Sequence, residues 1–122
     1  MRLDDAPILV VDDDPSILST VADILEFEGY SVECASSGEQ ALEIVDQSLP
    51  ALVLLDMRMP TMDGWDFARE IEERGIKLPI VVMTAAQNAK QWAQEINAQG
   101  YIAKPFDLAD LLDEVQRVRR TA

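Results

Sequence analysis

Leu52-Val53-Leu54-Leu55-Asp56 is the stretch that decides the fold, because four apolar residues without alternation end abruptly on a carboxylate. A short run of this kind is typical of a strand that is buried on both faces, as in a parallel sheet. Ligands of such sheets bind at the carboxyl ends of the strands, so polar residues at those ends meet in one crevice when the strands are neighbours. Three further apolar runs end in the same way: residues 8–11 before Asp12 and Asp13, residues 80–83 before Thr84, and residues 101–103 before Lys104.

Helical patterns separate these strands. Asp14 is placed to cap a helix that begins at Pro15 and ends before Gly29. Ser37-Gly38-Glu39-Gln40 is typical of a capping box that opens a second helix. Strict alternation of strands and helices, (βα)5, predicts an α/β fold with a five-stranded parallel sheet covered on both faces. The remaining elements are expected as a strand at residues 32–35, a helix end at Pro50, and helices at about 65–74, around 90–96 and from 108 onward.

Length and composition limit the class of protein. The 122 residues suit a single domain, 1–122, with a core but without a separate catalytic lobe. A net charge of -13 argues against direct binding of nucleic acid, because polyanion binding requires a basic face. With no apolar signal core and no run approaching the ~20 residues of a membrane helix, a soluble cytoplasmic protein without a membrane partner is expected. Cys34, the single cysteine, is predicted to be a buried thiol.

The chain contains no histidine. This excludes Ser-His triads, histidine metal sites and a phosphohistidine carried on the chain itself. A chemical step must therefore use carboxylates, threonine, lysine or a metal ion.

Asp12, Asp13 and Asp56 form a candidate cluster of hard oxygen ligands, which suits Mg²⁺ or Mn²⁺ rather than zinc. The plainer interpretation of Asp12-Asp13 is a hydrophilic turn beside a helix cap. Asp56 is the natural nucleophile, since a carboxylate can attack phosphorus to give an aspartyl-phosphate. A metal ion, Lys104 and Thr84 would then supply positive charge and a donor to the phosphoryl oxygens.

Four motifs stand in order along the chain: Val10-Val11-Asp12-Asp13-Asp14-Pro15, Leu54-Leu55-Asp56-Met57-Arg58-Met59-Pro60 with Met62-Asp63-Gly64, Val82-Met83-Thr84-Ala85, and Lys104-Pro105-Phe106. Together they closely resemble the receiver domain of two-component response regulators, the CheY-like family. The resemblance covers essentially the whole chain. It implies a flavodoxin-like sheet with strand order 2-1-3-4-5.

The resemblance also implies a function for the acidic residues. Asp56 would accept a phosphoryl group from the phosphohistidine of a partner histidine kinase or phosphotransfer protein. Asp13, Asp56 and the Arg58 backbone carbonyl would bind Mg²⁺ directly, and Asp12 would act largely through water. The domain would catalyse its own phosphoryl uptake and hydrolysis without being a conventional enzyme.

The remaining motif residues are implied to form the switch. Thr84 would hydrogen-bond the phosphoryl group, and Lys104 would pair with it. Tyr101 occupies the family's switch-aromatic position, which turns inward when Thr84 moves toward phosphate. The Lys104–Pro105 peptide bond is usually cis in the family. A downstream protein partner or output domain would bind the altered surface.

Two other functions are weighed against this one. A Mg²⁺-dependent phosphatase using Asp56 is disfavoured, because Arg58 stands where a nearby acid would be needed and a cap domain is missing. A phosphorylation-independent interaction module usually lacks one of the acidic, threonine or lysine residues, whereas this chain has them all.

Several points stay open at the level of sequence. The segment between Thr84 and Lys104 is shorter than is usual in the family. Trp65 and Trp92 suit either packing or an interface anchor. Phosphorylation-linked dimerisation, and whether the receiver stands alone or belongs to a longer chain, are also undecided.

Overall fold

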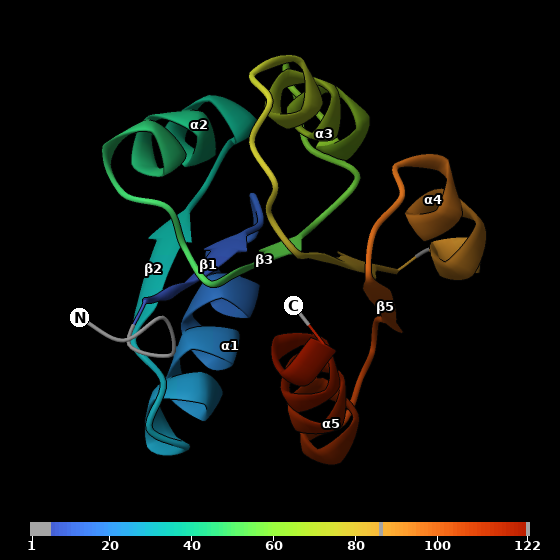
Figure 1. Ribbon diagram of the computed structural model, residues 1–122. Coiled ribbons are helices and arrows are strands. Elements are labelled where there is room, and N and C mark those ends of the chain that lie inside the picture. The colour runs from blue at the N-terminus through green and yellow to red at the C-terminus, as the bar shows by residue number, and fades with distance from the viewer. Residues whose placement is uncertain (1–5, 86, 122) are drawn as a thin grey trace.

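The computed structural model describes residues 6–85 and 87–121, in which strands and helices alternate along the chain (Figure 1). The strands are β1 (Ile8–Val11), β2 (Val32–Ala35), β3 (Leu52–Leu55), β4 (Ile80–Thr84) and β5 (Gly100–Ala103). The helices are α1 (Pro15–Phe27), α2 (Gly38–Gln47), α3 (Gly64–Glu73), α4 (Ala89–Glu95) and α5 (Leu108–Thr121). The predicted (βα)5 order is confirmed.

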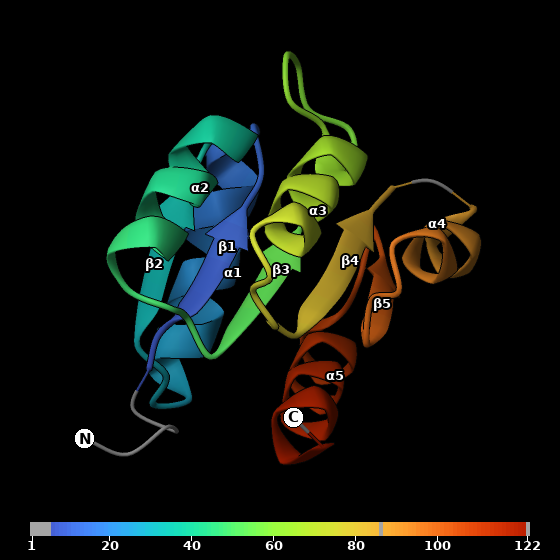
Figure 2. The same ribbon diagram turned by 45° about the horizontal axis from the view of Figure 1, so that its top comes forward.

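The strands form one parallel sheet in the predicted order, β2-β1-β3-β4-β5. Val11, at the end of β1, lies beside Ala35 of β2 and Leu55 of β3. Thr84, at the end of β4, lies beside Ala103 of β5. Figure 2 shows the arrowheads of β1 and β4 pointing to the same edge of the sheet. The polar residues that follow the strands therefore leave the sheet at one common edge.

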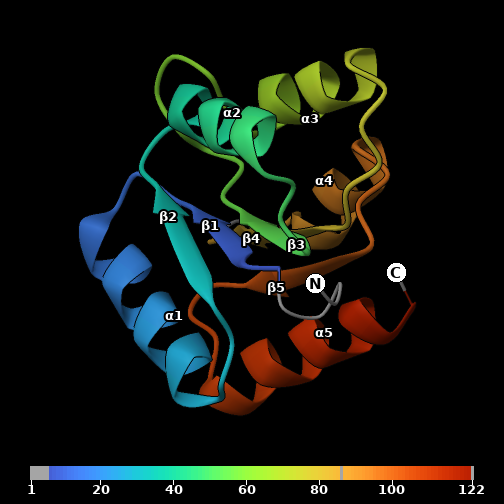
Figure 3. The same cartoon turned by 60° about the vertical axis from the view of Figure 1, so that its left-hand side comes forward.

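The central strands are apolar throughout because both of their faces are buried. Successive side chains of a strand point to opposite faces, so each central strand contributes to two apolar layers. One layer packs β1 and β3 against α2, α3 and α4, and the other packs them against α1 and α5. Figure 3 shows α1 and α5 on one side of the sheet and α2 and α3 on the other. None of the helices described combines the length and the apolar character that crossing a bilayer demands.

The loops that leave the carboxyl edge are fixed by helix caps. The Asp14 carboxylate accepts a hydrogen bond from the Ser16 N–H at 2.9 Å, so α1 begins at Pro15 as predicted. At α3, Asp63 and Asp66 form a reciprocal capping box, and the helix begins at Gly64, one residue before its predicted start. Both caps hold short acidic loops against the sheet.

The capping box predicted for α2 is only half formed. Ser37 Oγ accepts from the Gln40 N–H at 3.1 Å, as predicted. The Gln40 amide oxygen, however, accepts from the N–H of Ser36 at 2.7 Å rather than from that of Ser37. The Gln40 side chain thus bonds to the residue before the N-cap, Ser36, instead of to the N-cap residue Ser37.

Cys34 is exposed, so the prediction of a buried thiol is wrong. The residue lies in β2, which forms one edge of the sheet. Glu33 beside it is exposed as well. Because an edge strand has a neighbouring strand on one side only, the helices cover it less completely than they cover β1 and β3.

We expect Gly64→Ala to lower the free energy of unfolding by about 1–3 kcal/mol, the usual cost of overpacking. A Cβ at this position would lie 2.8 Å from the Met57 Cα and would also collide with the Met57 sulfur. Gly38→Ala is the matched control, because the three atoms nearest to its Cβ would all belong to the flexible Met62 side chain, and a smaller loss is expected. Urea unfolding measures both variants. Gly64→Ala with the parent's stability would show that the loop after β3 is not held so closely.

Candidate functional site

Polar side chains converge at the carboxyl edge of the sheet, as the strand ends predict. Asp12 follows β1, Asp56 follows β3, Thr84 ends β4 and Lys104 follows β5. Asp12, Asp56 and Thr84 are buried, with 0%, 6% and 1% of their surfaces exposed. A pocket of about 360 Å³ opens here, lined by Asp56, Arg58, Thr84, Ala85 and Lys104. Residues from three separate strand ends therefore share one small, polar cavity.

Asp12, Asp13 and Asp56 form an acidic cluster whose carboxylate oxygens lie within 4.8 Å of one another. The parallel register creates the cluster, since the Asp56 N–H donates to the Val11 carbonyl at 2.9 Å. All three side chains offer hard oxygen donors, the ligands that Mg²⁺ and Mn²⁺ prefer. Close carboxylates repel one another, and a divalent cation removes that repulsion. The donor set therefore fits a hard divalent cation.

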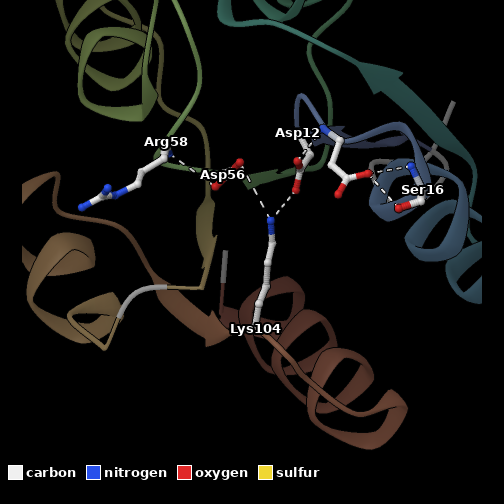
Figure 4. Close-up of polar contacts among 6 residues, drawn as sticks. Asp12, Ser16, Asp56, Arg58 and Lys104 are labelled. Atoms are coloured by element: carbon white, nitrogen blue, oxygen red, sulfur yellow. Dashed lines mark hydrogen bonds and ion pairs between the residues drawn. The ribbon is translucent and has the colours of Figure 1, made fainter.

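Lys104 extends between the two buried carboxylates (Figure 4). Its Nζ donates to Asp12 Oδ2 at 2.6 Å and lies 3.9 Å from Asp56 Oδ2. Asp12 also accepts from the Asp14 N–H at 2.9 Å. Asp12 is thus compensated more closely than Asp56, which leaves Asp56 as the less well neutralised carboxylate of the pair. The peptide bond that follows this lysine, Lys104–Pro105, is cis.

The environment of Asp56 raises its pKa from 3.8 to about 6. Burial is the main cause, because it removes water from the charged form. The negative charge of Asp12 adds to the rise, whereas Lys104 and the Arg58 N–H, 3.4 Å from Asp56 Oδ1, oppose it. A cation bound by the cluster would favour the ionised, nucleophilic form of Asp56.

Tyr101 does not lie in the pocket. It is 42% exposed on β5, and its N–H donates to the Glu114 carboxylate at 3.0 Å. Thr84, by contrast, is buried at the end of β4. The structure therefore brings together Asp12, Asp13, Asp56, Thr84 and Lys104, and it places Tyr101 on the surface beside α5.

Sequence reasoning considered Arg58 for its backbone carbonyl and as the residue that stands where a phosphatase would need an acid, but it missed the contacts of the Arg58 side chain. Its guanidinium carbon lies 5.3 Å from the ring centroid of Trp92 in α4. Trp92 in turn meets Trp65 edge to face, with ring centroids 4.8 Å apart. The Trp65 indole N–H donates to Glu95 at 2.9 Å. No local pattern predicts these contacts, because they join residues some thirty positions apart. Both tryptophan rings thus make packing contacts within the domain.

The doubly wound sheet and the acidic pocket at its carboxyl edge define a flavodoxin-like domain whose site suits a divalent cation. Comparison with known families shows which family of flavodoxin-like domains this chain belongs to. The family model for the response regulator receiver domain matches residues 8–116. The chain therefore belongs to the receiver domains of two-component response regulators.

Relatives agree with this assignment. Response regulator MprA of Mycobacterium sp. (strain KMS) is 38% identical over 118 residues, which cover 94% of this chain and 51% of that protein. MprA of Mycobacterium leprae (strain TN) is 37% identical over 115 residues, which cover 93% of this chain and 50% of that protein. The chain thus spans about half the length of these curated relatives.

Solved structures share the fold. The receiver domain of NtrX from Brucella abortus superposes with a TM-score of 0.87 at 32% identity, covering 94% of this chain and 99% of that one. Chemotaxis protein CheY4 of Vibrio cholerae gives a TM-score of 0.84 at 32% identity, covering 93% of this chain and 98% of that one. The likeness extends over nearly the whole domain.

In the absence of metal, we expect Asp56→Asn to be more stable than the parent above pH 6 by about 1–3 kcal/mol. Folded Asp56 holds a proton up to about pH 6, whereas the unfolded chain releases it near 3.8. The parent therefore loses stability as pH rises through this window, and the neutral amide does not. The gap should close as pH falls toward 4.

Urea unfolding in EDTA across this pH range measures the gap. Asp46→Asn is the matched control, because Asp46 is an exposed aspartate that pairs with Arg74 outside the pocket. A gap between Asp56→Asn and the parent that is independent of pH would contradict the raised pKa.

Proposed function

We propose that Asp56 is the phosphoacceptor of this receiver domain. The supporting observation is its position: Asp56 belongs to the acidic cluster and also lines the pocket that contains Thr84 and Lys104. One carboxylate oxygen can thus face a phosphoryl group while the other remains with the cluster. Membership of the receiver family suggests that the donor would be the phosphohistidine of a histidine kinase or phosphotransfer protein. None of the 122 residues is a histidine, so the donor histidine would lie outside this sequence.

The proposed transfer is a displacement at phosphorus. An Asp56 carboxylate oxygen attacks the phosphorus atom, the phosphorus–nitrogen bond to the donor imidazole breaks, and its electron pair returns to that nitrogen, which takes up a proton. Attack requires the ionised carboxylate, so the raised pKa of Asp56 works against it in the metal-free domain. Catalysis of such a step comes mainly from positioning and from positive charge on the phosphoryl oxygens.

We assign the Mg²⁺ site to Asp12, Asp13 and Asp56, with the Arg58 backbone carbonyl as a further ligand; Mn²⁺ suits the same donors. The bound ion would neutralise charge on the transferring phosphoryl group. Asp12, which already holds the Lys104 ammonium, would act largely through water. A phosphatase acting on outside substrates is not favoured, since Arg58 stands where such an enzyme would need a nearby acid. The domain would instead take up and hydrolyse only its own phosphoryl group.

Thr84 and Lys104 would convert phosphorylation into a change of shape. Lys104 lies 3.9 Å from Asp56 and can exchange Asp12 for a phosphoryl oxygen as its partner. Thr84 would donate its hydroxyl to the phosphoryl group and move toward it. Tyr101, exposed on β5, would turn inward toward the space that Thr84 leaves. The phosphoryl group would thereby select one of two surface states.

The altered surface would be offered to a downstream protein or to an output domain. The expectation that nucleic acid is not bound directly concerns these 122 residues alone, whose net charge is -13. We propose a cytoplasmic location, where the domain would encounter the phosphohistidine of its kinase.

We expect the parent to gain one phosphoryl group when it is incubated with acetyl phosphate and Mg²⁺. Asp56→Asn should gain none, because the amide is a poor nucleophile. Intact-protein mass measures the adduct, and EDTA should abolish it. Asp46→Asn, which lies outside the pocket, is the control and should behave as the parent does. Undiminished uptake by Asp56→Asn would remove Asp56 as the acceptor. No uptake by the parent, even after short incubations, would favour a phosphorylation-independent module.

We expect Lys104→Met to bind Mg²⁺ but to uncouple phosphorylation from the movement of Tyr101. NMR of the Asp13 and Tyr101 amides separates the two events. Mg²⁺ should shift Asp13 in both proteins, whereas acetyl phosphate should shift Tyr101 only in the parent. Lys77→Met, at an exposed lysine before β4, serves as the control. Equal Tyr101 shifts in Lys104→Met and the parent would refute the role of Lys104.

A further inference from the structure

Arg58 lines the pocket, but its guanidinium lies over the ring of Trp92. The Arg58 N–H lies 3.4 Å from Asp56 Oδ1, so the residue begins beside the acceptor. Its guanidinium nevertheless points away from Asp56 and Lys104 toward α4 (Figure 4). There the guanidinium carbon lies 5.3 Å from the centroid of the Trp92 ring, within the range of a cation–π contact. A cation that could face the pocket is thus held on an aromatic face outside it.

Trp92 is a fixed partner for this cation. It is only 8% exposed and belongs to the apolar layer that packs against α2, α3 and α4. The edge-to-face contact with Trp65, at an interplanar angle of 67°, holds the ring from the α3 side. Trp65 is itself tied to α4 by its hydrogen bond to Glu95. The ring that carries Arg58 is therefore positioned by both helices.

The pocket would attract the guanidinium if Trp92 did not hold it. Three carboxylates, of Asp12, Asp13 and Asp56, lie within 4.8 Å of one another there. Phosphorylation of Asp56 would add further negative charge and oxygen acceptors that match the forked guanidinium donors. Arg58 already lines the pocket, so rotation of its side chain bonds would bring the guanidinium to the pocket mouth.

We propose that Trp92 is a positioning residue that holds Arg58 out of the phosphoryl pocket and thereby shortens the lifetime of the aspartyl-phosphate. The proposal rests on Asp56 being the phosphoacceptor. In hydrolysis a water oxygen attacks phosphorus, the phosphorus–oxygen bond to Asp56 breaks, and its electron pair returns to the carboxylate. The water's protons pass to the phosphate formed and to solvent. With Arg58 on Trp92, the mouth is open to that water; a released guanidinium would bind the phosphoryl oxygens and cover it.

The test compares rates of phosphate loss after acetyl phosphate has been removed. Trp92→Leu fills much of the same volume without an aromatic face, and we expect it to lengthen the half-life of the phosphoprotein by about threefold or more. Trp92→Phe keeps an aromatic face and should restore a half-life close to that of the parent. Trp65→Phe keeps an aromatic ring beside Trp92 and leaves the ring beneath Arg58 unchanged. It is the matched control, and its half-life should stay close to that of the parent.

Removal of the Arg58 side chain tests whether the effect of Trp92→Leu on the half-life depends on the guanidinium. In an Arg58→Ala background, Trp92→Leu should leave the half-life unchanged, because no cation is left to be released. An independent measurement is the NMR shift of the Arg58 side-chain protons, which the Trp92 ring current should move upfield in the unphosphorylated parent and not in Trp92→Leu. This second measurement needs no phosphorylation.

Each outcome is decisive. A slower loss in Trp92→Leu that disappears without Arg58 supports the proposal. Faster loss, a change of equal size with and without Arg58, or unshifted Arg58 protons in the parent overturns it. If the parent takes up no phosphoryl group at all, the proposed function fails; if it does and only the coupling to Arg58 is missing, this inference alone fails.

Discussion

The rest of the site depends on one electrostatic constraint: two carboxylates, Asp12 and Asp56, are buried side by side at the edge of the sheet. Burial of a charge is costly unless a partner of opposite charge is close. Lys104 meets this requirement for Asp12 at 2.6 Å and reaches Asp56 only at 3.9 Å. Among the described residues, no fully buried side-chain nitrogen or oxygen is left without a hydrogen-bond partner. The remaining imbalance is concentrated on Asp56, whose pKa rises to about 6. Any species that brings positive charge close to the Asp56 carboxylate would therefore stabilise its ionised form.

The packing of the sheet stabilises this close placement of Asp12 and Asp56. β1 and β3 are buried on both faces along all four of their residues, so apolar packing from two layers holds these strands in the sheet. The parallel register then places Asp12 and Asp56 at the same level, one strand apart. The caps at Asp14 and Asp63 fix the two loops that follow. Packing energy on both faces of the sheet thus holds like charges together against their repulsion.

Arg58 connects the pocket to the opposite side of its own loop. Its N–H faces Asp56, while its guanidinium lies on Trp92 and so on the aromatic contact between α3 and α4. α4 is a short helix, and its N-cap residue, Asn88, makes no side-chain capping hydrogen bond. Contacts of Trp92 and Glu95 with Trp65 join this helix to α3, in addition to its packing against β4 and β5. Arg58 thus contacts both the phosphoacceptor candidate Asp56 and the aromatic ring of α4.

The sequence by itself determined the alternation of strands and helices, the parallel sheet and the set of polar residues at its edge. It could do so because periodicity, caps and apolar runs are local, and because the four motifs identify the receiver family. Only the tertiary structure decided that Lys104 pairs with Asp12 more closely than with Asp56, that Cys34 is exposed on an edge strand, and that the Arg58 side chain lies on Trp92. These contacts join residues far apart in the chain. Their distances depend on how loops and helices pack around the sheet, which no local pattern records.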